Sequence, residues 1–236
     1  MLDDFLDTIE GAKTREQVWQ TCAAYFAANG LDKTIYVDSH AGGSRIFTTM
    51  PDAWLAHYQD QSYIRFDPFL EHCCHTLQPV GTGREYLSDH SFLGEAARRL
   101  IMEAGEVGFR AGFSCTTRKF GPNGAAGWNL GSELGRCELE RIRDERGDML
   151  RLAALYGHER IAAVGSDRQA DLNLSLREKD CLRWSAGGLR TKEIAERMNL
   201  RPVTVELHLK NARTKLRAAT REQAVAIALL KGVIEL

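Results

Sequence analysis

The chain has 236 residues, of which 44% are hydrophobic and 27% are charged, and its formal net charge at pH 7 is −1. This composition is typical of a globular protein with room for one large domain or two smaller ones. It excludes a membrane-spanning class, because no apolar run approaches the roughly 18 residues that a spanning helix needs. The acidic start MLDDFLDTIEG also lacks the basic segment of a secretory signal. We therefore expect a cytoplasmic protein with no membrane partner.

Residues 1–162 alternate patterns typical of helices and short strands. A helix is expected at 14–30, where Thr14 and Gln17 form a capping box and Gly30 ends the apolar pattern. We then expect strands at 33–39 and 44–50, helices at 51–60, 67–77 and 91–108, strands at 112–120 and 125–132, and a helix at 137–163. This order predicts an α+β domain, an α-β-α sandwich with an antiparallel sheet and a cavity between the sheet and one helical layer.

A change of composition separates this domain from the rest of the chain. Residues 163–173 are mostly polar and show no apolar period, which predicts a linker. From residue 167 onward the chain carries 14 Lys and Arg against nine Asp and Glu, a charge of +5, whereas the remainder carries −6. This asymmetry favours nucleic-acid binding at the C-terminal end, although a solvated surface would show the same balance.

Residues 174–236 show helical patterns alone. Ser175 with Glu178 and Thr220 with Gln223 are capping pairs, and helices are expected at 176–188, 192–200, 203–216 and 221–232. The second and third helices are separated by a few residues, as in a helix-turn-helix. We therefore predict an all-α, four-helix domain that places its third helix in the major groove of double-stranded DNA.

The C-terminal region resembles the DNA-binding domain of LuxR-type transcription factors over nearly its whole length. The shared pattern is L-S-x-R-E, L-x-W-x-A-x-G, E-I-A, T-V-x-x-H-x-x-N and K-L. The N-terminal region is similar to the signal-binding domain of quorum-sensing members of that family. The residues that carry this similarity are Trp54, Tyr58, Asp67 and Pro68, at the spacing W-x3-Y-x8-D-P, and Gly112.

The resemblance implies a ligand-responsive, DNA-binding transcriptional regulator of the quorum-sensing type. Such a regulator binds an N-acyl-homoserine lactone or a related small amphipathic signal. It acts as a homodimer on an inverted-repeat operator, with RNA polymerase as a further partner. The alternative is an orphan regulator of the same fold that is ligand-independent or responds to a non-lactone ligand.

Asp67 and Tyr58 are the polar groups that we expect in the ligand pocket. A ligand amide needs a carboxylate to accept its N–H and a hydroxyl to donate to its carbonyl. In an apolar cavity, an unmatched polar partner costs about 1–3 kcal/mol. Local sequence alone favours another role for Asp67, the N-cap of the helix that begins at Pro68, and both roles can hold. Trp54 and Tyr58 are one helical turn apart and share a face, an arrangement also common in protein cores.

Two positions depart from the family pattern. Acyl-lactone receptors carry a Trp that is expected to bind the lactone carbonyl where this chain has Thr82, and many carry an aromatic residue in place of Met50. The shorter Thr82 leaves volume beside the head group, which suggests a changed or relaxed ligand choice. Trp128 refills this space if it faces the cavity, and Asn129 then points away, but the sequence does not decide the phase of that strand. The candidate ligand-binding residues are Met50, Trp54, Tyr58, Asp67, Pro68, Thr82, Gly112 and Trp128.

The third helix of the C-terminal domain supplies the candidate DNA-reading residues. Lys210 suits guanine O6 and N7, and Glu206 suits the N4 amine of cytosine, although it also fits a surface acid beside Lys210. The rest of the reading face is Thr204, Leu207 and Asn211. Lys192, Arg213 and Lys215 are expected to contact phosphates or to remain solvated. Helical spacing places Val203, Val205 and Leu209 in the core.

The run His72-Cys73-Cys74-His75 brings together four common zinc-ligand side chains. On a helix, consecutive side chains turn by about 100°, so four in succession cannot surround a metal tetrahedrally. We expect no metal site, with one or both cysteines packing inward and the histidines outward. The six cysteines show no repeated spacing, which makes a disulfide framework unexpected. No catalytic motif such as G-x-S-x-G, a P-loop or H-E-x-x-H is present, so we expect no enzyme and no cofactor besides the small-molecule signal.

Overall fold

The computed structural model describes residues 2–40, 43–121, 124–164 and 174–234. Contacts between residues divide the chain into two units, Met1–Gly165 and Ser166–Leu236. Most of the predicted linker, from residue 165 to 173, lies outside the described residues, as do residues 41–42 and 122–123, each between two predicted strands. Within the described ranges, no helix has the length and apolar character to cross a membrane.

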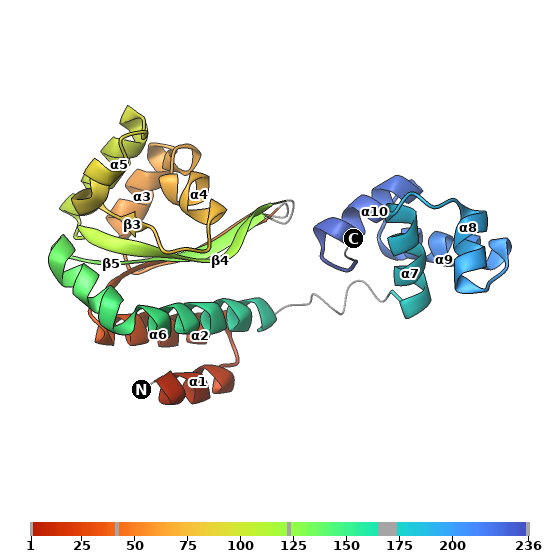
Figure 1. Ribbon diagram of the computed structural model, residues 1–236, viewed down its shortest axis with the longest axis horizontal. Coiled ribbons are helices and arrows are strands. Elements are labelled where there is room, and N and C mark those ends of the chain that lie inside the picture. The colour runs from red at the N-terminus through yellow and green to blue at the C-terminus, as the bar shows by residue number, and fades with distance from the viewer. Residues whose placement is uncertain (1, 41–42, 122–123, 165–173, 235–236) are drawn as a thin grey trace. The chain divides into compact units, whose positions relative to one another are not determined.

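The first unit is built on an antiparallel sheet with helices on both faces. Five strands in its described part follow the order β2-β1-β5-β4-β3. Figure 1 shows α3, α4 and α5 over one face, and α2 and α6 over the other, with α1 packed beyond them. The elements are α1 (Leu2–Gly11), α2 (Arg15–Ala28), β1 (Lys33–His40), β2 (Gly43–Thr48), α3 (Asp52–Asp60), η1 (Tyr63–Arg65), α4 (Pro68–Glu71), η2 (Cys73–His75), β3 (Gly81–Thr82), η3 (Arg84–Asp89), α5 (Glu95–Glu106), β4 (Ala111–Gly121), β5 (Gly124–Ser132) and α6 (Arg136–Ala163). The predicted α+β class is confirmed.

A capping box explains where α2 begins. The Thr14 hydroxyl oxygen accepts from the Gln17 backbone N–H, and Gln17 Oε1 accepts from the Thr14 backbone N–H, as predicted. Helix α1 was not predicted from the sequence. It buries Phe5 and Ile9 in the core against α2 and α6, and the Arg160 guanidinium donates to carbonyl oxygens at its C-terminal end.

The helix predicted at 67–77 is wrong in its second half. Helix α4 ends at Glu71, and Cys73–His75 form a separate 3₁₀ turn. The hydroxyl of Thr116 on β4 donates to the Cys73 carbonyl at 2.9 Å, and both Cys73 and Cys74 are buried. Packing of this turn against the sheet therefore overrides local helix propensity. The helix predicted at 91–108 also begins later, at Glu95.

The sheet has two different faces because side chains alternate along each strand. Tyr36 on β1 and Trp128 on β5 are fully buried toward α2 and α6, within the main core. Their neighbours Ile35, Val37 and Asn129 point to the opposite face, beneath α3, α4 and α5. The upper face therefore holds the space in which a ligand can lie.

The second unit is helical throughout its described part. Its helices are α7 (Leu176–Ala186), α8 (Thr191–Met198), α9 (Pro202–Lys215) and α10 (Arg221–Leu230). The predicted capping box of Ser175 and Glu178 is present. Between α8 and α9, Asn199 adopts a left-handed conformation with φ of 52°, which makes the tight turn of a helix-turn-helix.

One predicted core residue of this unit lies on its surface. Val203 is 67% exposed, whereas Val205 and Leu209 are buried. Positions 205 and 209 are one turn apart and share the inner face of α9, whereas position 203 is about 200° away from position 205 around the helix. The assignment of Val203 to the core is therefore wrong.

Candidate functional site

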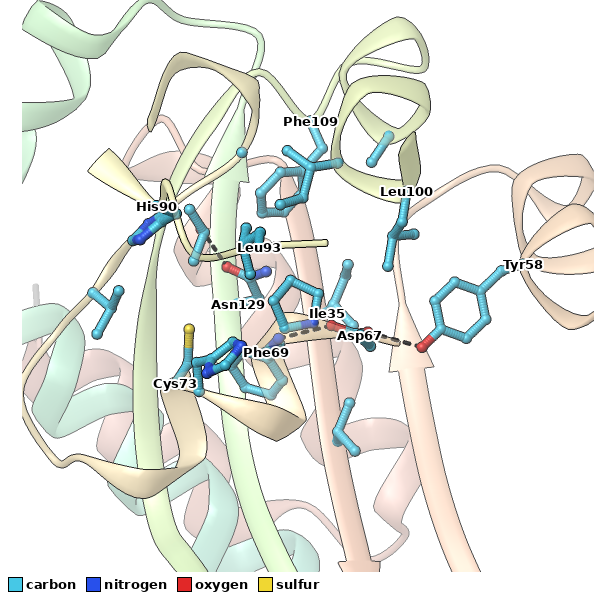
Figure 2. A pocket seen from close by; sticks show the side chains of 18 of the residues that line it. Ile35, Tyr58, Asp67, Phe69, Cys73, His90, Leu93, Leu100, Phe109 and Asn129 are labelled. Carbon is cyan, nitrogen blue, oxygen red and sulfur yellow. Dashed lines mark hydrogen bonds between the residues drawn. The ribbon is translucent and has the colours of Figure 1, made fainter. Parts of the chain in front are cut away.

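A cavity of about 320 Å³ lies between the sheet and the layer of α3, α4 and α5. Its walls are mainly apolar side chains from both layers, and a few polar groups converge on it (Figure 2). A volume of this order suits a small amphipathic molecule. Among the lining residues are Ile35, Val37, Ile46, Leu55, Phe69, Leu93, Leu100, Ile101 and Phe109.

Tyr58 and Asp67 form the polar end of the cavity at α3 and α4. The Tyr58 hydroxyl donates to Asp67 Oδ2 at 2.8 Å, while Oδ1 of the same carboxylate accepts the Phe69 backbone N–H at 2.8 Å. One oxygen of Asp67 thus makes the predicted cap, and the other lies at the cavity, bonded to Tyr58; its contact with a ligand stays a prediction. Burial raises the pKa of the Asp67 carboxyl, and burial together with the nearby carboxylate raises that of Tyr58.

Trp54 is placed beside this polar end by helix α3. Because Trp54 and Tyr58 are one turn apart, both reach the cavity. Pro68, in the first turn of α4, lines it as well. These three predicted ligand residues therefore come together with Asp67.

A second polar pair, Thr82 and Asn129, lies within the cavity wall. Thr82 Oγ1 donates to Asn129 Oδ1 at 2.6 Å, which leaves the Asn129 amide nitrogen as a donor. Figure 2 shows Asn129 projecting from the sheet among the apolar lining. Asn129 was not among the predicted site residues.

The sequence around Asn129 explains how it reaches the cavity. Gly127 and Gly131 occupy the same face of β5 on either side of it. A Cβ on Gly127 would lie 3.1 Å from Phe69 Cζ, and one on Gly131 would lie 2.5 Å from Phe109 Cζ. The glycines therefore let two phenyl rings lie against the sheet with Asn129 between them. The spacing G-x-N-x-G was the signal that could have identified this residue.

Trp128, Met50 and Gly112 do not line the cavity, in contrast to the prediction. Trp128 is on the other face of β5, packed against Trp19 and Tyr36 at centroid distances of 6.0 and 4.5 Å. It cannot fill the space beside Thr82, because alternate strand residues face opposite sides. The sequence left open which of the two residues, Trp128 or Asn129, faces the cavity, and the structure shows that it is Asn129.

Met50 and Gly112 do not reach the cavity themselves but contact residues that line it. Met50 is buried in a cluster with Trp54, Tyr63, Leu100 and Phe109. A Cβ on Gly112 would lie 2.9 Å from both Thr82 Oγ1 and Phe109 Cζ. Glycine at this position therefore lets both Thr82 of β3 and the Phe109 ring lie close to β4. The aromatic ring near Thr82 is thus that of Phe109.

His72, His90 and Phe92 form one border of the cavity. Phe92 is 61% exposed, and its ring centroid lies 4.6 Å from that of His72 and 5.8 Å from that of His90. His72 lines the cavity, so the expectation that it faces outward is wrong, whereas His75 is exposed. Burial raises the pKa of the Cys73 thiol to about 12, so this cavity-lining thiol is unreactive at neutral pH. The described residues contain no cluster of three or more potential metal ligands.

The surface of α9 carries the predicted DNA-reading residues. Glu206, Leu207, Lys210 and Asn211 are exposed along one side of the helix, and Thr204 is half-buried. Lys192 is exposed in the first turn of α8. These exposed side chains thus lie on α9 and on the start of α8, the two helices of the helix-turn-helix.

Two predicted phosphate contacts have partners within their own unit. The Lys215 ammonium lies 2.8 and 3.0 Å from the two carboxylate oxygens of Glu178, a residue with little exposure. The Arg213 guanidinium donates to the Ala219 carbonyl. These bonds join α9 to α7 and to the following turn. Contact of Arg213 and Lys215 with phosphates stays a prediction.

Comparison with known proteins agrees with this two-part organisation. Residues 14–161 match the model of the autoinducer binding domain, and residues 172–228 match that of bacterial regulatory proteins of the luxR family. The chain is 33% identical to the putative HTH-type transcriptional regulator y4qH of Sinorhizobium fredii, covering 100% of this chain and 73% of the relative. It is 26% identical to the transcriptional activator protein AnoR of Acinetobacter nosocomialis, covering 98% of each.

Solved structures show the same fold. The crystal structure of Escherichia coli SdiA matches with a TM-score of 0.74 at 23% identity, covering 100% of this chain and 98% of the other. A structure of SdiA in complex with octanoyl-rac-glycerol matches with a TM-score of 0.72 at 22% identity, covering 100% and 96%.

Proposed function

The chain belongs to the LuxR family of bacterial regulatory proteins, in the group that carries an autoinducer-binding domain, and from this membership we propose a specific ligand and mechanism. It is a DNA-binding transcriptional regulator and not an enzyme. We propose that its cavity binds an N-acyl-homoserine lactone or a closely related acyl signal, and that binding promotes the DNA-bound dimer. The proposed site of action is the cytoplasm, because that is where a bacterial operator is found.

The observation that carries this proposal is the Tyr58–Asp67 pair at one end of an apolar cavity. The Asp67 carboxylate can accept an amide N–H of the ligand, and the Tyr58 hydroxyl can turn to a ligand carbonyl. The acyl chain would then lie on the apolar lining, with about 25 cal/mol gained for each Å² removed from water. A ligand lacking the amide would leave the Tyr58–Asp67 bond as it is in the free protein and would gain no hydrogen bond from the carboxylate, a difference of about 0.5–1.5 kcal/mol or more.

The Thr82–Asn129 pair favours a broader head-group choice than a lactone alone. Thr82 stands where the family pattern has Trp, and the Asn129 amide nitrogen adds a donor that suits a carbonyl or hydroxyl oxygen. SdiA, a protein of the same fold, has been solved with octanoyl-rac-glycerol, whose head group carries hydroxyls. A non-lactone acyl ligand is therefore the second candidate.

The proposed homodimer is best supported by the outer face of α6. Leu152, Leu155 and Tyr156 are 45%, 43% and 48% exposed and lie within one helical turn, while Ala153 and Ala154 between them are buried in the core. Adjacent exposed apolar side chains suit a two-fold contact with a second copy. Two copies would present two α9 helices to half-sites about one DNA turn apart.

Ligand identity is tested by mass spectrometry of molecules that copurify from cells supplied with N-acyl-homoserine lactones or with monoacylglycerols. Thermal shift with each purified compound follows. Selective recovery and stabilisation by lactones supports the first candidate, and selectivity for monoacylglycerols supports the second. Absence of any stabilisation by either class would contradict both.

DNA reading is tested with Lys210→Ala on an inverted repeat selected from random DNA. We expect a loss of the affinity difference between that operator and unrelated DNA, because Lys210 would contact a base edge. The matched control is Lys231→Ala, which removes the same charge from an exposed position after α10. Full specificity in Lys210→Ala would contradict the assignment of α9 as the reading helix.

A further inference from the structure

Helix α3 carries three cavity residues, Trp54, Leu55 and Tyr58, yet few of its side chains are buried. Of the residues of α3, all of which the structure describes, Trp54 alone is buried. An element with few buried contacts opens at low free energy unless other bonds hold it. The position of Trp54 and Tyr58 over the cavity therefore depends on contacts beyond the buried core of α3 itself.

Tyr63 in η1 supplies part of this additional contact. Its ring centroid lies 6.4 Å from that of Trp54, 5.8 Å from that of His57 and 5.9 Å from that of Tyr58. The chain reaches this position through Ser62, which has a left-handed φ of 54°. That turn folds η1 back so that one buried ring touches three side chains of α3.

Glu103 on α5 binds both parts of this assembly. Its Oε2 accepts the Tyr63 hydroxyl at 2.6 Å and lies 2.9 Å from His57 Nε2. Helix α5 itself lines the cavity with Leu100 and Ile101. One carboxylate therefore joins α3 and η1 to α5, segments of the cavity cover that are far apart in sequence.

We propose that Glu103 is a positioning residue for ligand binding, and that Glu103, Tyr63 and His57 form a clasp that holds α3 against α5 over the cavity. The clasp sets how often the cover opens and thus how fast a bound acyl ligand leaves. Its role in ligand release rests on the proposed function, whereas its role in holding α3 does not.

The surrounding charges agree with an ionised Glu103. The hydrogen bond from Tyr63, the bond with His57 and the nearby Arg99 lower the pKa of its carboxyl below the usual value, against the opposing effect of burial. The bond to Glu103 contributes, after burial, to the raised pKa of the Tyr63 hydroxyl, about 12. At neutral pH the carboxylate is therefore a charged acceptor, and such bonds are stronger than neutral ones.

The first test needs no ligand. Hydrogen exchange of the full chain is compared between Glu103→Ala and the control Glu106→Ala, which removes an exposed glutamate from the same helix. We expect residues 52–65 to exchange at least about tenfold faster in Glu103→Ala, because the substitution removes the shared partner of Tyr63 and His57 and the loss of one charge-assisted bond alone accounts for about tenfold. Strand residues 33–39 and 125–132 should stay unchanged. Equal exchange at 52–65 in both variants would overturn the clasp.

The second test measures how fast N-phenyl-1-naphthylamine, a neutral fluorescent cavity probe, leaves the protein. Dissociation should be about tenfold faster from Glu103→Ala and from Tyr63→Phe, and the double variant should be no faster than either. Glu103→Gln should restore part of the slow release, because its amide oxygen still accepts from Tyr63. Additive effects of the two substitutions would contradict a shared bond.

The two proposals can fail separately. N-octanoyl-homoserine lactone that does not bind the wild-type chain contradicts the proposed ligand alone, because the exchange experiment is independent of it. Normal lactone binding with unchanged exchange at residues 52–65 contradicts the clasp alone.

Discussion

At the scale of single residues, the side chain of Asp67 serves two bonds at once. One oxygen caps α4 through the Phe69 N–H, and the other accepts from Tyr58 at the cavity. From the sequence alone, the cap role of Asp67 competed with the ligand-binding role, because an Asp before Pro is a common N-cap. Only the position of Tyr58 shows that the second oxygen lies at the cavity wall.

Replacing Asp67 with Asn should separate the two roles. Asn is as good an N-cap as Asp, so the thermal midpoint should change little. Its amide nitrogen could donate to the Tyr58 hydroxyl oxygen but could not accept a ligand N–H. Affinity for N-octanoyl-homoserine lactone should therefore fall about tenfold or more by isothermal titration calorimetry. Asp67→Ala, the comparison variant, should lose both stability and affinity. Wild-type affinity in Asp67→Asn would show that the ligand does not use this carboxylate.

At the scale of elements, an ion pair joins the first and third helices of the C-terminal unit, α7 and α9. Glu178 at the start of α7 binds its own cap residue Ser175 and the Lys215 ammonium at the end of α9. Burial raises the pKa of this carboxyl, but the bonds from Lys215 and Ser175 lower it by more, so its pKa lies below the usual value of 4.5. The reading helix is therefore oriented in part by a charge on another helix.

The lowered pKa fixes the sign of a pH dependence. The ionised Glu178 contributes stability above its unfolded pKa of about 4.5, and this contribution is lost as the pH falls through the lower folded value. At pH 7, Glu178→Gln should reduce the free energy of unfolding of the C-terminal unit by about 1–3 kcal/mol. The difference from wild type should shrink below about pH 4.5.

Thermal unfolding followed from pH 3 to 8 measures this effect. The control is Glu196→Gln, which alters an exposed glutamate on α8 and should change stability by less than about 0.5 kcal/mol. A Glu178→Gln deficit that stays constant across the whole pH range would contradict the role of the ionised pair.

At the scale of the whole molecule, the chain consists of two units with separate cores. The main core of the first unit includes Trp128, Tyr36 and Phe26, and the core of the second includes Leu182, Ile194 and Val205. A ligand in the cavity contacts residues of the first unit alone among those described. Ligand binding should therefore stabilise one unit directly.

Calorimetry of the full chain should resolve this difference. A lactone at about one hundred times its Kd stabilises the folded first unit by about 2.7 kcal/mol. Its transition should rise by roughly 5–10 °C, a shift expected for a unit of this size. The transition of the second unit should stay in place, and Asp67→Asn should reduce the shift of the first. Equal shifts of both transitions would show that the units unfold as one.

The sequence alone determined the order of most elements, the two-part organisation and the helix-turn-helix. Capping boxes at Thr14 and Ser175 and the helical spacing of Trp54 and Tyr58 depend on residues a few positions apart, so they are legible without the fold. The tertiary structure decided that Asn129 faces the cavity and Trp128 the core, because a two-residue period has two phases and only packing selects one. It also ended α4 at Glu71 and brought Glu103 to Tyr63, forty positions away. Contacts of that range are set by how helices pack on the sheet, which no local pattern encodes.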